Sequence, residues 1–529
     1  MKSVLTRIVT IILCFCMLCP LFLTVEVHAA LPSRPVPEKQ ENDPNDPAAA
    51  QNISGPELVT KHQGFYSLTP LFNKKEYYGT TASDHAFLTL ESGKGIGYLY
   101  MIFGDEYGAY TITNNDTGAT ATVGENLFLH ELIDLKQLFG TTVTSVTVQF
   151  DNGPVTINEV MAFTEGYLPD YVQVWTPPKE GETDLILFST HGDDDQLFFA
   201  GVLPYYCALD YEVLVVYMAD HSMRQPFRLH EMLDGLWGVG VTTYPVFGIF
   251  NDFYSEDMDA AYTNYERQGV LRDDIIAYVL AQLRKYKPMV VVGHDFAGEY
   301  SHALHMIYAD CLAAALEISN DPAQYPELAE TYGVWDVPKA YFHLYEENPI
   351  VMDWDTPMEE LDGYTPFEMT QLFGFPYHDS QQPSWVTYWL NGDNFSIKKA
   401  TDITTYSPCE YGLYFSTVGE DVEKNDFFEN VLSYAQQAQK AEEERLAEEA
   451  RLAEEARLAE EARLEEERRK QEEAEKAAAA ATEPSLPSEP AAPLDQEPAD
   501  HKLVPIIIAA ALIGILFLAV IFVRRKKNS

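Results

Sequence analysis

The hydrophobic pattern in the middle of the chain consists of short apolar runs that stop abruptly at polar residues. Residues 185–188 (LILF) and 289–292 (MVVV) are too short for helices and have the composition of buried parallel strands. Similar runs at 213–217 and 341–345 accompany helical periodicity at 273–286. Alternating strands and helices predict a Rossmann-like α/β domain, with a doubly wound parallel sheet and helices on both faces.

Residues 56–166 have a different pattern, in which short alternating runs are separated by turn residues such as Asp151-Asn152-Gly153. Strands of this kind predict a β-sandwich. The last two runs, 143–150 and 155–163, are expected to form a hairpin, and they resemble the final strands of galactose-binding-like jelly rolls. Such modules often bind glycans, whereas others only pack against a catalytic neighbour, and both alternatives stay open.

The polar residues that follow the two central strands carry the candidate chemistry. His191 and Asp193–Asp195 follow the first strand, and His302 and His305 follow the second. In open α/β sheets, ligands bind beyond the carboxyl ends of the strands. Two imidazoles and a carboxylate, with one position left for water, form the ligand set of a catalytic zinc. The alternative is a solvated turn whose aspartates cap a helix beginning near Gln196.

Three motifs in these segments resemble the PIG-L/LmbE family of zinc-dependent N-acetylglucosaminyl deacetylases. That family carries His-Pro-Asp-Asp-Glu and Gly-x-Tyr-Gly-His-x-x-His, matched here by residues 191–195 (HGDDD) and 298–305 (GEYSHALH). Its Arg-x-x-Glu feature stands at 228–231 (RLHE). The chain departs from the family pattern at Gly192, Asp195 and Ser301, and none of these departures removes a metal ligand.

The resemblance implies a zinc-dependent hydrolase domain at 167–434 that removes an acetyl group from an N-acetylglucosamine-type sugar. By position, the ligands of Zn²⁺ would be His191, Asp194 and His305. Asp193 would take the proton of the attacking water, and His302 would protonate the leaving amine.

The resemblance also implies residues that contact an N-acetylated glycan or glycoconjugate substrate. Tyr300 is expected to donate to the oxyanion formed from the acetamide. Arg228 is expected to orient sugar hydroxyls, with an ion pair to Glu231 as the structural alternative. His378 is expected either to reach the site or to be structural. Two other classes stay open, a metal-dependent phosphoesterase and a non-catalytic surface glycan-binding or adhesion protein.

The two ends of the chain predict export and anchoring in the cell membrane. Residues 1–29 have the pattern of a secretory signal peptide, and 30–55, heavy in Pro, Asp and Asn, is a predicted linker. Residues 503–523 are apolar and long enough to span a bilayer, and the basic tail 524–529 places the C-terminus in the cytoplasm. We therefore expect a single-pass protein with extracellular sandwich and catalytic domains. The formal charge of −47 argues against a nucleic-acid partner.

Residues 435–480 form a low-complexity segment in which RLAEEA repeats almost unchanged. Its residues are strong helix formers, and Glu-to-Arg spacings of three give ion pairs between turns. Because the repeat has six residues rather than seven, its leucines wind around the helix, which favours a single solvated rod over a coiled coil. An Ala/Pro-rich linker is predicted at 481–502.

Overall fold

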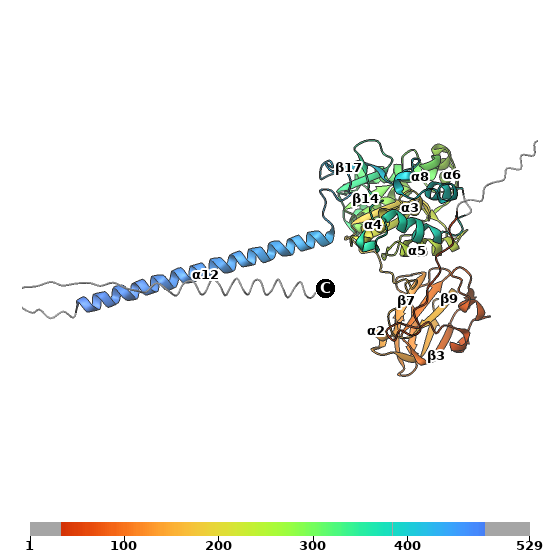
Figure 1. Ribbon diagram of the computed structural model, residues 1–529, viewed down its shortest axis with the longest axis horizontal. Coiled ribbons are helices and arrows are strands. Elements are labelled where there is room, and N and C mark those ends of the chain that lie inside the picture. The colour runs from red at the N-terminus through yellow and green to blue at the C-terminus, as the bar shows by residue number, and fades with distance from the viewer. Residues whose placement is uncertain (1–32, 383–384, 482–529) are drawn as a thin grey trace, which may run out of the picture. The chain divides into compact units, whose positions relative to one another are not determined.

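The computed structural model describes residues 33–382 and 385–481, and Figure 1 shows its elements. The predicted signal peptide, transmembrane segment (503–523) and basic tail lie outside these residues, as does nearly all of the Ala/Pro-rich linker. Within the described residues, no helix is both long and apolar enough to cross a bilayer. The chain divides into two units, Met1–Glu443 and Glu444–Ser529, which are described separately.

The first part of the larger unit consists of two antiparallel sheets, drawn in orange in Figure 1. One sheet has the order β1 (Val59–Gln63), β3 (Ala86–Ile96), β8 (Val143–Phe150), β5 (Tyr110–Asn114), β6 (Ala119–Val123). The other has the order β2 (Thr80–Ala82), β9 (Val155–Phe163), β4 (Tyr98–Phe103), β7 (His130–Asp134), and α2 (Leu135–Phe139) follows it. Both sheets contribute to one apolar core, in which the rings of Phe103 and Phe150 meet edge to face at 6.4 Å.

The expected hairpin between the last two runs is wrong. β8 pairs with β3 and β5, whereas β9 pairs with β2 and β4, so the turn after Phe150 carries the chain from one sheet to the other. The burial patterns explain the difference. Only alternate residues of β8 are buried. Nearly all residues of β9 are buried, because the outer face of that strand is also covered. The likeness to galactose-binding-like modules stays a prediction.

The segment before the sandwich, predicted as a linker, is packed against the protein from residue 33 onward. Ala50 is fully buried in a small core with Tyr100 and Phe163. Arg34 Nη2 donates to Gln371 Oε1 over 3.0 Å, and Lys39 forms an ion pair with Glu76. The Pro-rich composition concealed these contacts, because a few apolar and cationic side chains are enough to fix an extended segment.

The second part of the larger unit is built on a six-stranded sheet with the order β11-β10-β14-β15-β17-β16. The strands β11 (Val213–Tyr217), β10 (Leu185–Ser189), β14 (Val290–Gly293) and β15 (Lys339–His343) are parallel. The last two, β17 (Glu410–Ser416) and β16 (Pro349–Val351), are antiparallel to their neighbours. The prediction of a purely parallel sheet is therefore wrong at one edge. The chain after β15 stays at the end where β15 stops, so β17 re-enters without the crossover that a parallel strand needs.

Helices cover both faces of this sheet, because successive strand residues point to opposite sides. Ile186 and Phe188 pack on one side among residues of α6 (Met258–Arg267), α7 (Arg272–Tyr286) and α8 (Ala303–Ile318). Leu185 and Leu187 pack on the other with residues of α4 (Val202–Ala208), α5 (Phe227–Gly238) and α10 (Pro366–Met369). The other α-helices of this part are α3 (Asp194–Leu197), α9 (Pro326–Tyr332) and α11 (Thr387–Asn391). The strands β12 (Ala219–Asp220) and β13 (Phe250–Asn251) form a short parallel pair.

Short helical turns complete the element order. The 3₁₀ turns are η1 (Pro56–Leu58), η2 (Thr69–Phe72), η3 (Glu299–Ser301), η4 (Glu359–Leu361), η6 (Phe375–Tyr377), η7 (Asp393–Phe395) and η8 (Ala400–Asp402), and η5 (Thr370–Gly374) is a π turn. The strand order reverses direction at β10, since the chain moves from β10 to β11 and then back past β10 to β14. A crevice at such a switch point is where open α/β sheets bind ligands. The loops after β10 and β14 flank it.

The low-complexity segment is helical as α12 (Tyr434–Ala480), shown in blue in Figure 1. Arg451 pairs with Glu448 at 2.6 Å and with Glu455 at 2.5 Å, and the same spacing recurs along the helix. Its leucines are about half exposed. Whether the helix stays single or forms a coiled coil remains a prediction.

Candidate active site

The three predicted metal ligands meet at the carboxyl ends of β10 and β14. His191 Nδ1 lies 2.9 Å from Asp194 Oδ2 and 3.2 Å from His305 Nε2, and the last two atoms are 3.1 Å apart. All three side chains are buried. Ligand atoms about 2.1 Å from a tetrahedral ion are about 3.4 Å from one another. The three atoms are therefore spaced for one small cation.

The electrostatics of these three groups favour positive charge between them. Burial alone would raise the pKa of Asp194, but the charges of His305 and His191 hold it well below its usual range. Burial opposes protonation of His191, yet the Asp194 carboxylate raises its pKa to about 10. The pKa of His305 is raised in the same way to about 9. A divalent cation bound between the three groups would supply the positive charge that stabilises the Asp194 carboxylate.

Each candidate imidazole ligand is backed by a carboxylate that sets which nitrogen carries hydrogen. His305 Nδ1 contacts Glu299 Oε2 at 2.6 Å, and His191 Nε2 lies 3.3 Å from Asp252 Oδ1. In a metal-bound state these nitrogens would keep their hydrogens, because carboxylates accept, and the opposite nitrogens, which face Asp194, would give up theirs to bind the cation. Histidine ligands of metals have second partners of this kind. Sequence reasoning missed Glu299, although it lies inside the GEYSHALH motif, and also Asp252, which follows the very short β13.

Glu299 is the centre of a buried histidine cluster. Its Oε2 also accepts from His294 Nδ1 at 2.8 Å, and its Oε1 contacts His343 Nδ1 at 2.6 Å. Burial would raise the pKa of Glu299, but the charge of His294 and the hydrogen bonds from the three histidines hold it well below its usual value. The carboxylate is therefore fixed as an anion directly behind His305.

Two further histidines lie close enough to the cluster to be considered as ligands. His294 Nε2 already accepts from the backbone N–H of Thr190 at 2.9 Å, so its lone pair is occupied. His302 Nδ1 accepts from the N–H of Leu304 at 3.2 Å, which leaves the hydrogen on Nε2. The ring of His302 stacks on His305 with centroids 4.8 Å apart. His302 is thus oriented as a donor rather than a ligand.

The predicted base, Asp193, lies beside the ligands with its side chain free of any capping role. Asp193 is the N-cap residue of α3, but its side chain makes no capping hydrogen bond. Its Oδ1 accepts from Arg228 Nη2 at 2.9 Å. Burial raises the pKa of Asp193, and Arg228 opposes that shift. The alternative of a solvated capping turn is wrong, because residues 191–195 are buried.

Arg228 pairs with Asp193 rather than with Glu231, which was its structural alternative. Its ion pair is with Asp193, and Glu231 instead accepts from the backbone and hydroxyl of Ser380 at 2.8 and 2.6 Å. The expected Arg228–Glu231 pair is therefore wrong, and Arg228 is placed to orient the base. Contact with a sugar stays a prediction.

The remaining predicted residues differ in how near they lie to the ligands. The Tyr300 ring meets His302 and His305 edge-on, with centroids 5.3 and 5.4 Å away. His378 is buried against α5, where a Cβ on Gly235 would lie 2.9 Å from its Nε2, and burial lowers its pKa to about 3. Burial also raises the pKa of Asp195 to about 8, and its Oδ2 accepts from Gln196 at 2.7 Å. Tyr300 lies beside the candidate ligands, whereas His378 is packed against α5.

Comparisons with known proteins agree with the motifs. No family model matches the chain. A 1D-myo-inositol 2-acetamido-2-deoxy-alpha-D-glucopyranoside deacetylase 2 of Saccharopolyspora erythraea is 31% identical over 153 residues, which are 28% of this chain and 49% of the relative. The corresponding deacetylase of Streptomyces scabiei is 26% identical over 34% of this chain and 57% of its own. The chain thus spans about half the length of these curated relatives.

Solved structures give weaker matches. The N,N'-diacetylchitobiose deacetylase from Pyrococcus horikoshii is 15% identical with a TM-score of 0.28, over 44% of this chain and 82% of its own. A deacetylase of teicoplanin biosynthesis is 16% identical with a TM-score of 0.28, over 44% and 97%. Identities and TM-scores this low do not assign a function to this chain. The curated relatives are deacetylases, and they confirm the resemblance of this chain to the PIG-L/LmbE family.

Proposed function

We propose that this protein is a zinc-dependent hydrolase that removes the acetyl group from an N-acetylglucosamine-type sugar. The observation that carries the proposal is the cluster of His191 Nδ1, Asp194 Oδ2 and His305 Nε2, 2.9–3.2 Å apart, beside the Asp193 carboxylate. Two imidazoles and a carboxylate suit zinc better than magnesium or calcium, which prefer oxygen ligands. When bound, zinc supplies Lewis acidity and makes a water acidic enough to lose its proton near neutral pH.

The protein groups divide the proton transfers between them. Asp193, held by Arg228, accepts the proton of the attacking water. His302, which carries its hydrogen on Nε2, donates to the nitrogen of the leaving amine. Tyr300 lies beside both histidines and supplies a hydroxyl for the developing oxyanion.

The direct test is acetate release from N-acetylated sugars by the purified protein lacking residues 1–29 and 503–529. We expect release to stop when a chelator removes the metal and to return when Zn²⁺ is added. Acetate release that a chelator leaves unchanged would reject the metal mechanism. Release of phosphate from phosphate esters, without acetate release, would reject the deacetylase in favour of a phosphoesterase.

We further propose that the substrate is a cell-wall or surface glycan and that the catalytic domain is extracellular. The support is the signal-like pattern at 1–29 and the apolar segment 503–523 followed by basic residues. A chain ending before Lys502 should leave the membrane fraction while keeping its activity. Retention of that truncated chain in the membrane would contradict anchoring by the C-terminal segment.

A further inference from the structure

Aromatic rings from three separate segments gather beside His302, the proposed acid. Tyr300 of η3 packs against Trp389 with centroids 4.9 Å apart and meets Trp385 edge-on at 5.5 Å. The ring of Tyr254 lies 6.5 Å from that of Tyr300 and is nearly parallel to it, at 5°. Tyr254 also meets His302 edge-on at 5.1 Å. The rings thus form a continuous aromatic surface that begins at the proposed acid.

The outer members of this surface face solvent. Trp385 is 54% exposed and Tyr254 is 59% exposed, while Tyr300 and Trp389 beneath them are half-buried. Neither exposed ring is needed to fill the core. Trp385 and Tyr254 come from segments 131 residues apart in the chain (385 − 254 = 131), yet both pack on Tyr300. Exposed aromatic groups gathered at one place mark a binding surface rather than scattered surface residues.

We infer that Trp385 and Tyr254 form a subsite for the sugar next to the one that is deacetylated. The inference rests on the proposed function and names its substrate class, an oligosaccharide or polysaccharide containing N-acetylglucosamine rather than a single-sugar conjugate. A pyranose ring has a face of C–H groups that packs on an aromatic ring, while its hydroxyls stay in water around the edge. Partly exposed Trp and Tyr side chains, apolar on the face and polar at the tip, suit this ligand.

The charges around the surface favour a neutral sugar over other ligands that stack. Nucleobases also stack on aromatic side chains, but their phosphates need a basic groove. Here the Tyr254 hydroxyl donates to Glu256 at 2.8 Å, and Asp252 lies two residues away beside His191. The whole chain carries a formal charge of −47. Carboxylates repel a phosphate chain, whereas they accept hydrogen bonds from sugar hydroxyls.

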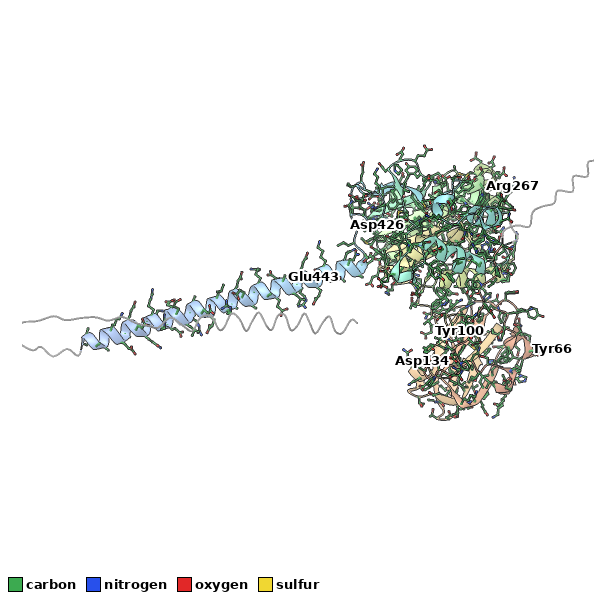
Figure 2. All side chains as sticks on the ribbon, viewed as in Figure 1. Tyr66, Tyr100, Asp134, Arg267, Asp426 and Glu443 are labelled. Atoms are coloured by element: carbon green, nitrogen blue, oxygen red, sulfur yellow. The ribbon has the colours of Figure 1, made fainter. Side chains whose placement is uncertain are left out.

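The test compares acetate release from N-acetylglucosamine and from its soluble β-1,4-linked tetramer. We expect the wild-type kcat/KM to be higher for the tetramer, and Trp385→Ala to lower the ratio of tetramer to monomer kcat/KM by about 3- to 10-fold. Trp385→Phe, which keeps an aromatic face, should retain much of that ratio. Tyr66→Ala is the matched control, because Tyr66 is fully exposed on the sandwich (Figure 2) and should leave the ratio unchanged.

The outcomes separate the subsite from the chemistry. A wild-type enzyme with no preference for the tetramer, or a Trp385→Ala loss that is equal for both sugars, would overturn the subsite while leaving the deacetylase in place. Absence of acetate release from every sugar would reject the proposed function instead. Calorimetric binding of the tetramer then decides the subsite alone. Weaker binding of the tetramer to Trp385→Ala than to the wild type would support the subsite. Absence of binding to the wild type would overturn it.

Discussion

Two clusters of histidines and carboxylates in the part of the chain that the structure describes differ in whether their ring nitrogens are available to a cation. In the ligand cluster (His191, Asp194 and His305), one nitrogen of each imidazole faces the same carboxylate oxygen, and a second carboxylate lies behind the other nitrogen. The second, or boundary cluster, lies between the sandwich and α5 and contains Lys39, Glu76, His130, His230 and Asp234. Judged by residue types alone, both clusters could be metal sites.

The two histidines of the boundary cluster belong to a linear series of hydrogen bonds. The Asn158 amide donates to His230 Nε2 at 3.3 Å, so His230 Nδ1 donates to His130 Nε2 at 2.8 Å, and His130 Nδ1 donates to Tyr100 at 3.0 Å. Lys39 supplies the positive charge beside Glu76 and Asp234. No nitrogen of these two rings is left for a metal. Occupied lone pairs, more than residue type or proximity, therefore separate a structural cluster from a catalytic one.

The largest expected effect comes from removing the base beside the ligand cluster. Asp193→Asn should keep the metal and the contact with Arg228, but lower kcat by roughly 10²–10⁴-fold, because an amide cannot accept the proton of water. Acetate release and metal content of the same preparation check this. Activity within about tenfold of wild type would mean that Asp193 is not the base.

The next effect concerns the carboxylate behind His305. Glu299→Gln should weaken metal affinity by about 10–100-fold, since an amide holds the His305 tautomer less firmly than a buried carboxylate does. Titration with a competing chelator measures the change. Glu91→Gln is the control, because Glu91 is exposed on β3. Equal affinities for the two variants would remove Glu299 from the metal site.

Breaking the boundary cluster should change stability instead of metal binding. His230→Ala leaves the Asn158 donor and the His130 acceptor unpaired, which costs about 1–3 kcal/mol of unfolding free energy. Urea unfolding measures that cost, and metal analysis should give the wild-type content. Loss of metal from His230→Ala would contradict the distinction between the clusters.

The smallest effect is a pH dependence of stability at the boundary cluster. Burial lowers the pKa of His130 to about 3 and that of His230 to about 4, so the folded protein keeps both rings neutral where the unfolded chain binds protons below about pH 6.5. Their contribution is complete above pH 6.5 and is lost as the pH falls toward 4. When the pH falls from 7 to 5, the free energy of unfolding of His230→Asn should decrease by up to about 2 kcal/mol less than that of the wild type. Parallel losses would show that His230 does not titrate on unfolding.

The sequence predicted most of the site because the ligand-bearing loops follow strands whose apolar runs are unmistakable. His191, Asp193, Asp194, His302 and His305 all came from two such loops, and the structure brings them together. Glu299 and Asp252 were missed because only three-dimensional packing places them behind the imidazoles. His378 was expected either to reach the site or to be structural, and the structure buries it against α5.

The fold was predictable where local pattern decides it and not where distant pairing does. Alternation identified the strands of the sandwich, but partner choice placed β8 and β9 in different sheets. The antiparallel strand β17 returns after an irregular stretch that carries no periodic signal. Composition also concealed the packing of residues 33–55, because Ala50 and Lys39 act through partners far along the chain.

The measurement that tests the central claim most directly is the zinc content of His302→Ala and His305→Ala, prepared side by side. Because His305 Nε2 faces the Asp194 carboxylate while His302 keeps its hydrogen on Nε2, we predict that His302→Ala retains about one zinc per chain and that His305→Ala retains none. The reverse pattern, with zinc lost from His302→Ala and kept in His305→Ala, would contradict the account.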